Sequence, residues 1–228
     1  MATTSARHQT WQFFAFVSVF FAVWTLRATI GFSIDESIDG SIARAAYSTT
    51  LKCVLWVLPA ASFAYWARNQ SPPRYLGLSA IPSMQHWLGS LLITGVFLLV
   101  VAIYEIGLGS KFISIAPLAA QPLVLSLLQL AVSPLLEELL FRGLVLHELQ
   151  TIAPRLIANV LTSLLFAAVH LPFWLAHGGL SMAVAANVFG LFLFSLLAGW
   201  LYAQTSSVWP STVAHSANNL LVMVLQTS

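Results

Sequence analysis

Long apolar stretches separated by short polar ones run through the whole chain. A helix needs about 20 mostly apolar residues to cross the roughly 30 Å hydrocarbon core of a bilayer. The stretches of this kind that are nearly free of charge predict seven membrane-spanning helices, or eight if residues 112–150 divide near Pro122. The expected spans are 8–26, 52–67, 87–104, 112–136, 156–176, 181–203 and 208–225.

The segments between these spans hold most of the charged and helix-breaking residues. Residues 31–48 predict a water-exposed loop, and the proline-containing segment 68–83 predicts a hydrophilic connection. The loop carries four charged residues, Asp35, Glu36, Asp39 and Arg44. Lys52 opens the second expected span, so we expect its side chain to extend to the membrane surface.

The composition supports a membrane protein. Hydrophobic residues make up 59% of the 228 residues and charged residues 7%, against about 45–50% and about 25% in soluble domains. We therefore expect an all-α, polytopic transmembrane bundle that contacts the lipid bilayer and no nucleic acid, because nine basic residues are too few for a basic binding surface. The small size and low lysine content suggest a multi-pass protein of a bacterial inner membrane. A single cysteine excludes an internal disulfide.

Glu137, Glu138 and Arg142 form the first polar group within the apolar segments. Ionisable residues in a membrane segment are costly and therefore mark candidate functional sites. Glu138 and Arg142 are four residues apart with the acid first, a favourable arrangement for an ion pair on one helix. Glu137 lies about 100° around the helix from Glu138, so it stays available for another role. The alternative is that both glutamates mark the exit of a helix into water.

Two further polar groups lie on later apolar segments. His170 follows Phe166 by one helical turn, and His215 precedes Asn219 by one turn. Taken singly, His170 could be a hydrogen-bonded core residue, and the other pair could join two helices. Taken with Glu137, they supply a base, two proton-sharing imidazoles and an amide donor, which suits a buried site that activates water.

The three motifs resemble those of the CAAX-processing and bacteriocin-self-immunity (CPBP, or ABI) intramembrane proteases. Glu137-Glu138-x-x-x-Arg142, Phe166-x-x-x-His170 and His215-x-x-x-Asn219 occur in the family's order, without departure at the motif positions, across roughly residues 120–225. The resemblance divides the chain into N-terminal transmembrane helices, 1–111, and a catalytic core, 112–228.

The resemblance implies a function and a role for each motif residue. The function is hydrolysis of a peptide bond near the C-terminus or membrane anchor of a substrate whose C-terminal segment is hydrophobic or lipidated. Glu137 would be the general base and His170 its partner in activating water, while His215 and Asn219 would form the oxyanion hole. The supporting residues would be Glu138 and Arg142, which orient these groups, and Phe166, which shapes the pocket.

The family has also been described as metal dependent. Zinc bound by Glu137, His170 and His215 is therefore the alternative, and it requires all three to converge to about 2 Å from one ion. The same groups can activate water without a metal, so no cofactor is the favoured expectation.

Two other functions are compatible with the motifs. A non-catalytic immunity or scaffold protein of the same fold would not need a base beside an oxyanion hole. A proton-coupled transporter could use Glu137 and His170 as a relay, but no inverted repeat is visible and the His215 and Asn219 pair would have no special place in it.

Overall fold

The protein is a bundle of membrane-spanning helices, and its computed structural model describes residues 4–31, 34, 37–109 and 111–227. Within this part of the chain, six helical segments are long and apolar enough to cross a membrane. They are His8–Ile30, Ser41–Ala67, Met84–Gly107, Leu123–Ile152, Arg155–Ala176 and Met182–Thr205. The expected all-α, polytopic architecture is confirmed, and the protein is a multi-pass membrane protein.

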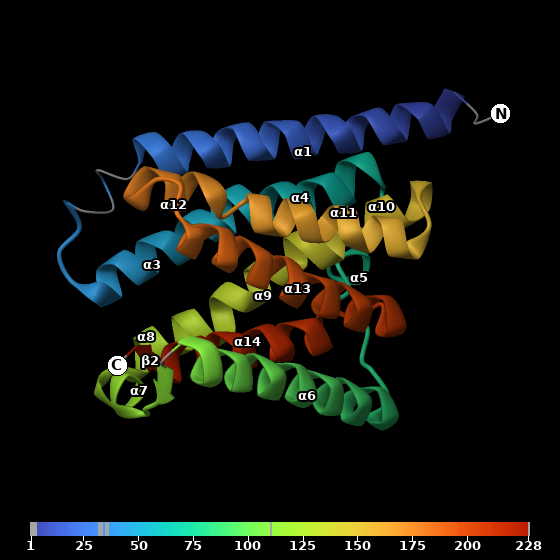
Figure 1. The fold of residues 1–228 in the computed structure, drawn as a ribbon. Helices are drawn as coiled ribbons and strands as arrows, with labels where there is room; N and C mark the ends of the chain where they lie inside the picture. The colour runs from blue at the N-terminus through green and yellow to red at the C-terminus, as the bar shows by residue number, and fades with distance from the viewer. Residues whose placement is uncertain (1–3, 32–33, 35–36, 110, 228) are drawn as a thin grey trace.

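The first half of the chain forms three long helical segments, of which α1 and α6 lie on opposite sides of the bundle (Figure 1). The second segment is one continuous helix that contains two π-helical stretches, Cys53–Val57 and Phe63–Ala67. The α-helices of this half are α1 (Thr4–Ile30), α3 (Ser41–Lys52), α4 (Leu58–Ser62), α5 (Pro72–Tyr75) and α6 (Met84–Gly109).

The second half begins with a short strand and ends with another, β1 (Lys111–Ile113) and β2 (Leu225–Thr227), which pair antiparallel. Two π-helical stretches, Leu128–Val132 and Leu139–Leu146, interrupt the fourth long segment. The α-helices of this half are α7 (Ala116–Ala120), α8 (Leu123–Leu127), α9 (Ser133–Glu138), α10 (His147–Ile152), α11 (Arg155–Ala168), α12 (Leu171–Gly178), α13 (Met182–Thr205) and α14 (Val208–Val224).

The last expected span, 208–225, is present as α14 but is short. Its 17 residues reach about 26 Å at 1.5 Å per residue, less than the hydrocarbon thickness of a bilayer. The helix packs against α6, α9 and α13, and its buried residues include Ala214 and His215. We conclude that α14 is an inner helix of the bundle, and this accounts for six long segments where the sequence predicted seven.

The expected span 112–136 is wrong in its limits. Residues 111–120 form β1 and α7, and the membrane-spanning segment starts only at Leu123 and continues to Ile152. The chain does divide at Pro122, but α7 has five residues and cannot form an eighth span. As a consequence, Glu137 and Glu138 lie near the middle of a 30-residue segment and not where a helix leaves the membrane.

The expected loop 31–48 is shorter than predicted. Helix α3 begins at Ser41 and is continuous with the second span. Asp35 and Glu36 lie outside the described residues, whereas Asp39 and Arg44 are exposed. Lys52 therefore lies near the middle of a 27-residue segment, and the expectation that it reaches the membrane surface is wrong. Its ammonium group points into the bundle, as described below.

An aromatic cluster joins the N-terminal helices to the rest of the bundle. The ring of Trp56 packs edge-on against Phe20 of α1 and against Phe141 of the fourth segment. Phe141 packs in the same way against Phe166 of α11. All four side chains are buried, so this cluster fixes the second segment beside the helices that carry the three motifs.

A buried ion pair forms a second link between the two halves. The guanidinium of Arg68 donates two hydrogen bonds of 2.7 Å to the carboxylate of Glu148, and the hydroxyl of Tyr75 donates to the same carboxylate. The ring of His147 packs on Tyr75 with centroids 4.5 Å apart. The segment that follows the second span is thereby attached to α10.

Candidate active site

The three sequence motifs meet inside the bundle. Glu137 and Glu138 are the last two residues of α9, His170 lies in the turn between α11 and α12, and His215 lies in the middle of α14. Pro172 follows the turn at His170 and occupies the first turn of α12, where a missing backbone N–H is tolerated. The expected span 156–176 is therefore divided into α11 and α12, with His170 at the bend.

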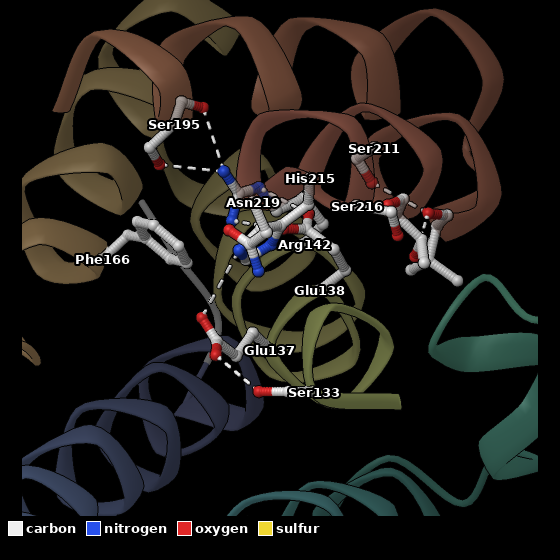
Figure 2. Close-up of polar contacts among 12 residues, drawn as sticks. Ser133, Glu137, Glu138, Arg142, Phe166, Ser195, Ser211, His215, Ser216 and Asn219 are labelled. Carbon is white, nitrogen blue, oxygen red and sulfur yellow. Dashed lines mark hydrogen bonds and ion pairs between the residues drawn. The ribbon is translucent and has the colours of Figure 1, made fainter. Parts of the chain in front are cut away.

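Glu137 is the residue on which the two histidines converge. Its Oε2 atom lies 3.9 Å from Nε2 of His170 and 3.8 Å from Nε2 of His215. Figure 2 shows the Glu137 carboxylate between Ser133 and the polar group around His215. The residue is 5% exposed. These separations exceed direct hydrogen-bond distances and suit a bridging water molecule between the carboxylate and the imidazoles.

Lys52 binds the other oxygen of the same carboxylate. Its Nζ atom lies 2.5 Å from Oε1 of Glu137 and 2.6 Å from Oγ of Ser133. The hydroxyl of Ser133 in turn donates to Oε1 of Glu137 at 3.2 Å. The two oxygens of Glu137 therefore differ, since Oε1 accepts from Lys52 and Ser133 while Oε2 faces His170 and His215.

Glu138 holds His215 through a fully buried network. Its Oε1 atom lies 2.8 Å from Nδ1 of His215 and accepts a 3.2 Å hydrogen bond from Nη1 of Arg142. Arg142 also donates to the hydroxyl and the carbonyl oxygen of Ser195 on α13. Glu138 and Arg142 are both 0% exposed. Beside a guanidinium the carboxylate is ionised and only accepts, so Nδ1 of His215 carries a proton and Nε2 is directed toward Glu137.

His170 is oriented in a similar way. Its Nδ1 atom lies 2.8 Å from the carbonyl oxygen of Phe166, which can only accept, so Nε2 of the neutral imidazole is an acceptor. The ring of Phe166 lies 5.2 Å from the His170 ring and 5.7 Å from the His215 ring, and Arg142 stacks above it at 4.8 Å. Phe166 thus separates the two imidazoles and keeps both directed toward Glu137.

Two cavities adjoin these side chains. A cavity of about 220 Å³ is lined by Lys52 and His170, and a larger one of about 870 Å³ is lined by Ser133 and Asn219. Phe173 lines both. One wall of the larger cavity is apolar, with leucines from α8 and the π-helical stretch that follows it, and Val222 and Met223 from α14. The α3 side is mostly polar and contributes Ser41, Arg44, Ser48 and Thr49. Ser133, which contacts Glu137, thus lies in the wall of the larger cavity, and His170 lies in the wall of the smaller one.

Asn219 lines the larger cavity and lies one helical turn after His215 on α14. Its Nδ2 atom donates to the carbonyl oxygen of Gln129 at 3.4 Å. Glu137, His170 and His215 are brought together, whereas Asn219 reaches the site from the adjoining space.

The zinc alternative is a poor fit to this arrangement. Among the described residues, no group of three or more His, Cys, Asp or Glu side chains is placed to hold a metal ion. The ammonium group of Lys52 already lies on Oε1 of Glu137, and a divalent cation bound to that carboxylate would be close to a like charge. We therefore derive no step through a metal.

Sequence reasoning missed three residues that contact the motif side chains, namely Lys52, Ser133 and Ser195. Lys52 had a usable signal, since it is an ionisable residue in an otherwise apolar stretch, but the expected helix started at this residue and placed it at the surface. Ser133 lies one turn before Glu137, a spacing that could have been noticed. The contact of Ser195 depends on the packing of α13, for which no local pattern exists.

The fold and the site define a multi-pass membrane protein with a buried carboxylate and imidazole centre. Residues 119–221, which include all three motifs, match the family model described as Type II CAAX prenyl endopeptidase Rce1-like. This part of the chain is therefore similar to a protease family, in agreement with the resemblance of its motifs. No curated protein and no solved structure matches the chain.

Proposed function

We propose that the protein is an intramembrane endopeptidase that cleaves a peptide bond near the C-terminus or membrane anchor of its substrate. In this proposal Glu137 and His170 activate the attacking water. His215 and Asn219 face the substrate carbonyl group, and Glu138, Arg142 and Phe166 keep the imidazoles in place. Residues 112–228 form the catalytic core, and the membrane is the inner membrane of a bacterium.

The proposed reaction is carried by the protein's own side chains. A water molecule between Oε2 of Glu137 and Nε2 of His170 gives a proton to the carboxylate while its oxygen attacks the peptide carbonyl carbon. The electron pair of the C=O bond moves to the carbonyl oxygen, which becomes an oxyanion. When the intermediate collapses, the C–N bond breaks and Glu137 returns the proton to the leaving nitrogen, so a carboxylic acid and an amine are released.

One observation carries this proposal: Oε2 of Glu137 lies 3.8–3.9 Å from the Nε2 atoms of both histidines inside a cavity-lined bundle. Burial of a charged group costs free energy unless all of its polar atoms have partners. A scaffold protein would therefore gain no stability from the Glu137 carboxylate, whose Oε2 atom has no direct hydrogen-bond partner among the described residues. A proton-coupled transporter could also use Glu137 to carry protons, but that function does not explain why Glu138 and Arg142 hold His215 in a fixed orientation.

The family match supports a CAAX-type substrate. A prenylated or otherwise hydrophobic C-terminal segment fits the apolar lining of the larger cavity. We propose that the substrate's apolar tail enters the bundle through this cavity and that the scissile bond reaches Glu137 at its inner end.

The decisive experiment is mass spectrometry of membrane-anchored proteins from cells that carry the wild-type gene, no gene, or the variants Glu137→Gln and His170→Ala. We expect the same uncleaved proteins to accumulate without the gene and in both variants, because loss of a general base costs about 10²- to 10⁴-fold in rate. Glu105→Gln is the matched control, since Glu105 forms a partly exposed ion pair with Lys111 at the end of α6.

Each other outcome contradicts the proposal in a different way. If Glu137→Gln cleaves as the wild type does, the endopeptidase mechanism is wrong. If the variant loses cleavage but keeps a cellular immunity phenotype, the phenotype comes from a scaffold role. Proton or solute flux in proteoliposomes that disappears with Glu137→Gln would identify a transporter.

A further inference from the structure

The candidate site is short of hydrogen-bond donors for an oxyanion. His170 and His215 each use the Nδ1 proton for another acceptor, the Phe166 carbonyl oxygen and the Glu138 carboxylate. In their neutral forms both Nε2 atoms are therefore acceptors. The amide nitrogen of Asn219 is engaged with the backbone of Gln129 in the adjoining cavity. Asn219 keeps one free N–H bond for the substrate, so a second donor to a tetrahedral intermediate at Glu137 would have to come from another residue.

Lys52 supplies a donor at this position. An ammonium group has three N–H bonds, and in the described part of the chain two of them have acceptors, Glu137 and Ser133. The Lys52 side chain is 16% exposed, and it lines the 220 Å³ cavity together with His170. Among the residues that the structure describes, no hydrogen-bond acceptor is present for the third N–H bond, which leaves it to donate to a substrate in this cavity.

We propose that Lys52 is a catalytic residue that donates a hydrogen bond to the oxyanion of the tetrahedral intermediate. This inference rests on the proposed function. Lys52 lies outside residues 119–221, the part of the chain that matches the protease family, so the N-terminal helices complete the active site.

The movement of charge during the reaction favours this role. In the resting site the ammonium group of Lys52 is paired with the ionised carboxylate of Glu137 at 2.5 Å. When Glu137 takes the proton from water, its negative charge disappears and a negative charge develops on the substrate carbonyl oxygen. The cation then interacts more strongly with the oxyanion than with Glu137. An interaction that strengthens only in the transition state increases the rate.

The buried setting increases the strength of this interaction. Trp56, on which the ammonium group of Lys52 lies at 5.3 Å from the ring centroid, is 1% exposed. Since few water dipoles compete here, a fixed cation stabilises a nearby oxyanion more than it would in bulk water. Ser133 holds the ammonium group in place, so little reorganisation is needed when charge develops.

The first test measures cleavage of a farnesylated CAAX-type peptide by full-length protein in proteoliposomes. We expect Lys52→Met to lower kcat by about 10²- to 10³-fold, the usual cost of removing one oxyanion donor, with little change in KM. Lys52→Arg, which keeps the charge and the N–H groups, should recover part of the rate. Lys111→Met is the matched control, because Lys111 forms an ion pair of the same length with Glu105 but lies in β1, outside the candidate site. A kcat within about twofold of the wild type in Lys52→Met would overturn the proposal.

The second test distinguishes two roles of Lys52: a direct hydrogen bond to the oxyanion, and positioning of the Glu137 carboxylate. The probe is the same peptide with a phosphinate in place of the scissile bond, which imitates the tetrahedral intermediate. If Lys52 contacts the oxyanion, Lys52→Met weakens phosphinate binding by a similar factor in the wild-type and in the Glu137→Gln background. A loss seen only when Glu137 is present would show that Lys52 merely positions the base, and would overturn the proposal.

The remaining outcomes are also informative. If Lys52→Met does not fold, Lys52→Gln, which keeps a polar side chain of similar reach, takes its place. If the wild type neither cleaves nor binds the farnesylated probes, the CAAX-type substrate of the proposed function is wrong. The role of Lys52 is then tested by measuring the cleavage of endogenous membrane proteins in cells. Equal cleavage by Lys52→Met and Lys111→Met would contradict a catalytic role for Lys52.

Discussion

His215 and Glu138 are joined by a contact of 2.8 Å between Nδ1 and Oε1, and the same carboxylate is held by Arg142. This contact directs Nε2 of His215 toward Glu137. We expect Glu138→Gln to lower kcat by about 10- to 100-fold, the usual effect of losing a carboxylate that orients a functional histidine. The measurement is cleavage of the farnesylated peptide in proteoliposomes, with Glu105→Gln as the control, and unchanged kcat would show that the orientation of His215 is unimportant.

His170 is expected to act through its Nε2 atom. His170→Phe keeps an aromatic ring beside Phe166 and Trp174 but removes the group that faces Glu137. We expect a loss of about 10²- to 10⁴-fold in kcat with unchanged insertion into the membrane. His86→Phe is the control, because His86 is exposed and bonds only locally to Ser83. Equal kcat in His170→Phe and the wild type would remove His170 from the proposed mechanism.

Removal of metal ions should leave activity unchanged. Lys52 already neutralises the carboxylate of Glu137 in the structure, so the proposed chemistry needs no divalent cation. The measurement is peptide cleavage after dialysis against a chelator. Activity that is lost on chelation and restored by zinc would instead favour a zinc site made of Glu137, His170 and His215.

The ion pair between Arg68 and Glu148 is expected to stabilise the bundle. Arg68→Met leaves the carboxylate of Glu148, which is 5% exposed, without its main partner. Breaking a buried pair in this way costs about 3–5 kcal/mol, so thermal unfolding in detergent should move to clearly lower temperature. The matched control is Arg74→Met in the same connecting segment. Equal melting temperatures for the two variants would contradict a stabilising role for the pair.

The hydrogen bond from Tyr75 to Glu148 should contribute the same stability throughout the neutral pH range. Burial raises the pKa of the Tyr75 phenol, and the hydrogen bond to Glu148 raises it further. Because the pKa is higher in the folded than in the unfolded protein, the contribution is fully present below the unfolded value of about 10 and is lost only above it. The difference in melting temperature between Tyr75→Phe and the wild type should therefore not change across neutral pH, and a change there would contradict this assignment.

Gly143 permits a close contact between the fourth segment and the connection after α5. A Cβ atom at this position would lie 2.6 Å from the carbonyl oxygen of Leu76 and 3.0 Å from its Cα atom. Backbone atoms cannot move aside as a flexible side chain can, so we expect Gly143→Ala to destabilise the protein by about 1–3 kcal/mol. The control is Gly95→Ala, where nothing lies within 4 Å of the added atom. A similar melting temperature for both variants would show that the connection adjusts freely.

Several features were predictable because they depend on local pattern. The apolar stretches predicted the helices and the membrane, and the three motifs indicated the protease family whose model matches residues 119–221. The spacing of Glu138 and Arg142 predicted their ion pair, which the structure contains.

The errors have a common physical reason. A span was expected wherever charge was absent, but the fourth segment places Glu137 and Glu138 near its centre. There Lys52 and Arg142 compensate their charge, and His215 forms a hydrogen bond with Glu138. The second span was expected to begin at residue 52, whereas α3 begins at Ser41, because helix ends depend on packing as well as on composition. The limits of α14 were nearly correct, but its 17 residues are too few for the expected membrane span.

The amino-acid sequence by itself determined that the protein is a helical membrane protein and which side chains are candidates for chemistry, since hydropathy and spacing along a helix are local properties. Only the tertiary structure decided which of these side chains meet. It placed Lys52 on Glu137, 85 residues apart, and left Asn219 in the adjoining cavity. Contacts of this kind depend on how separate helices pack, and no local pattern records that packing.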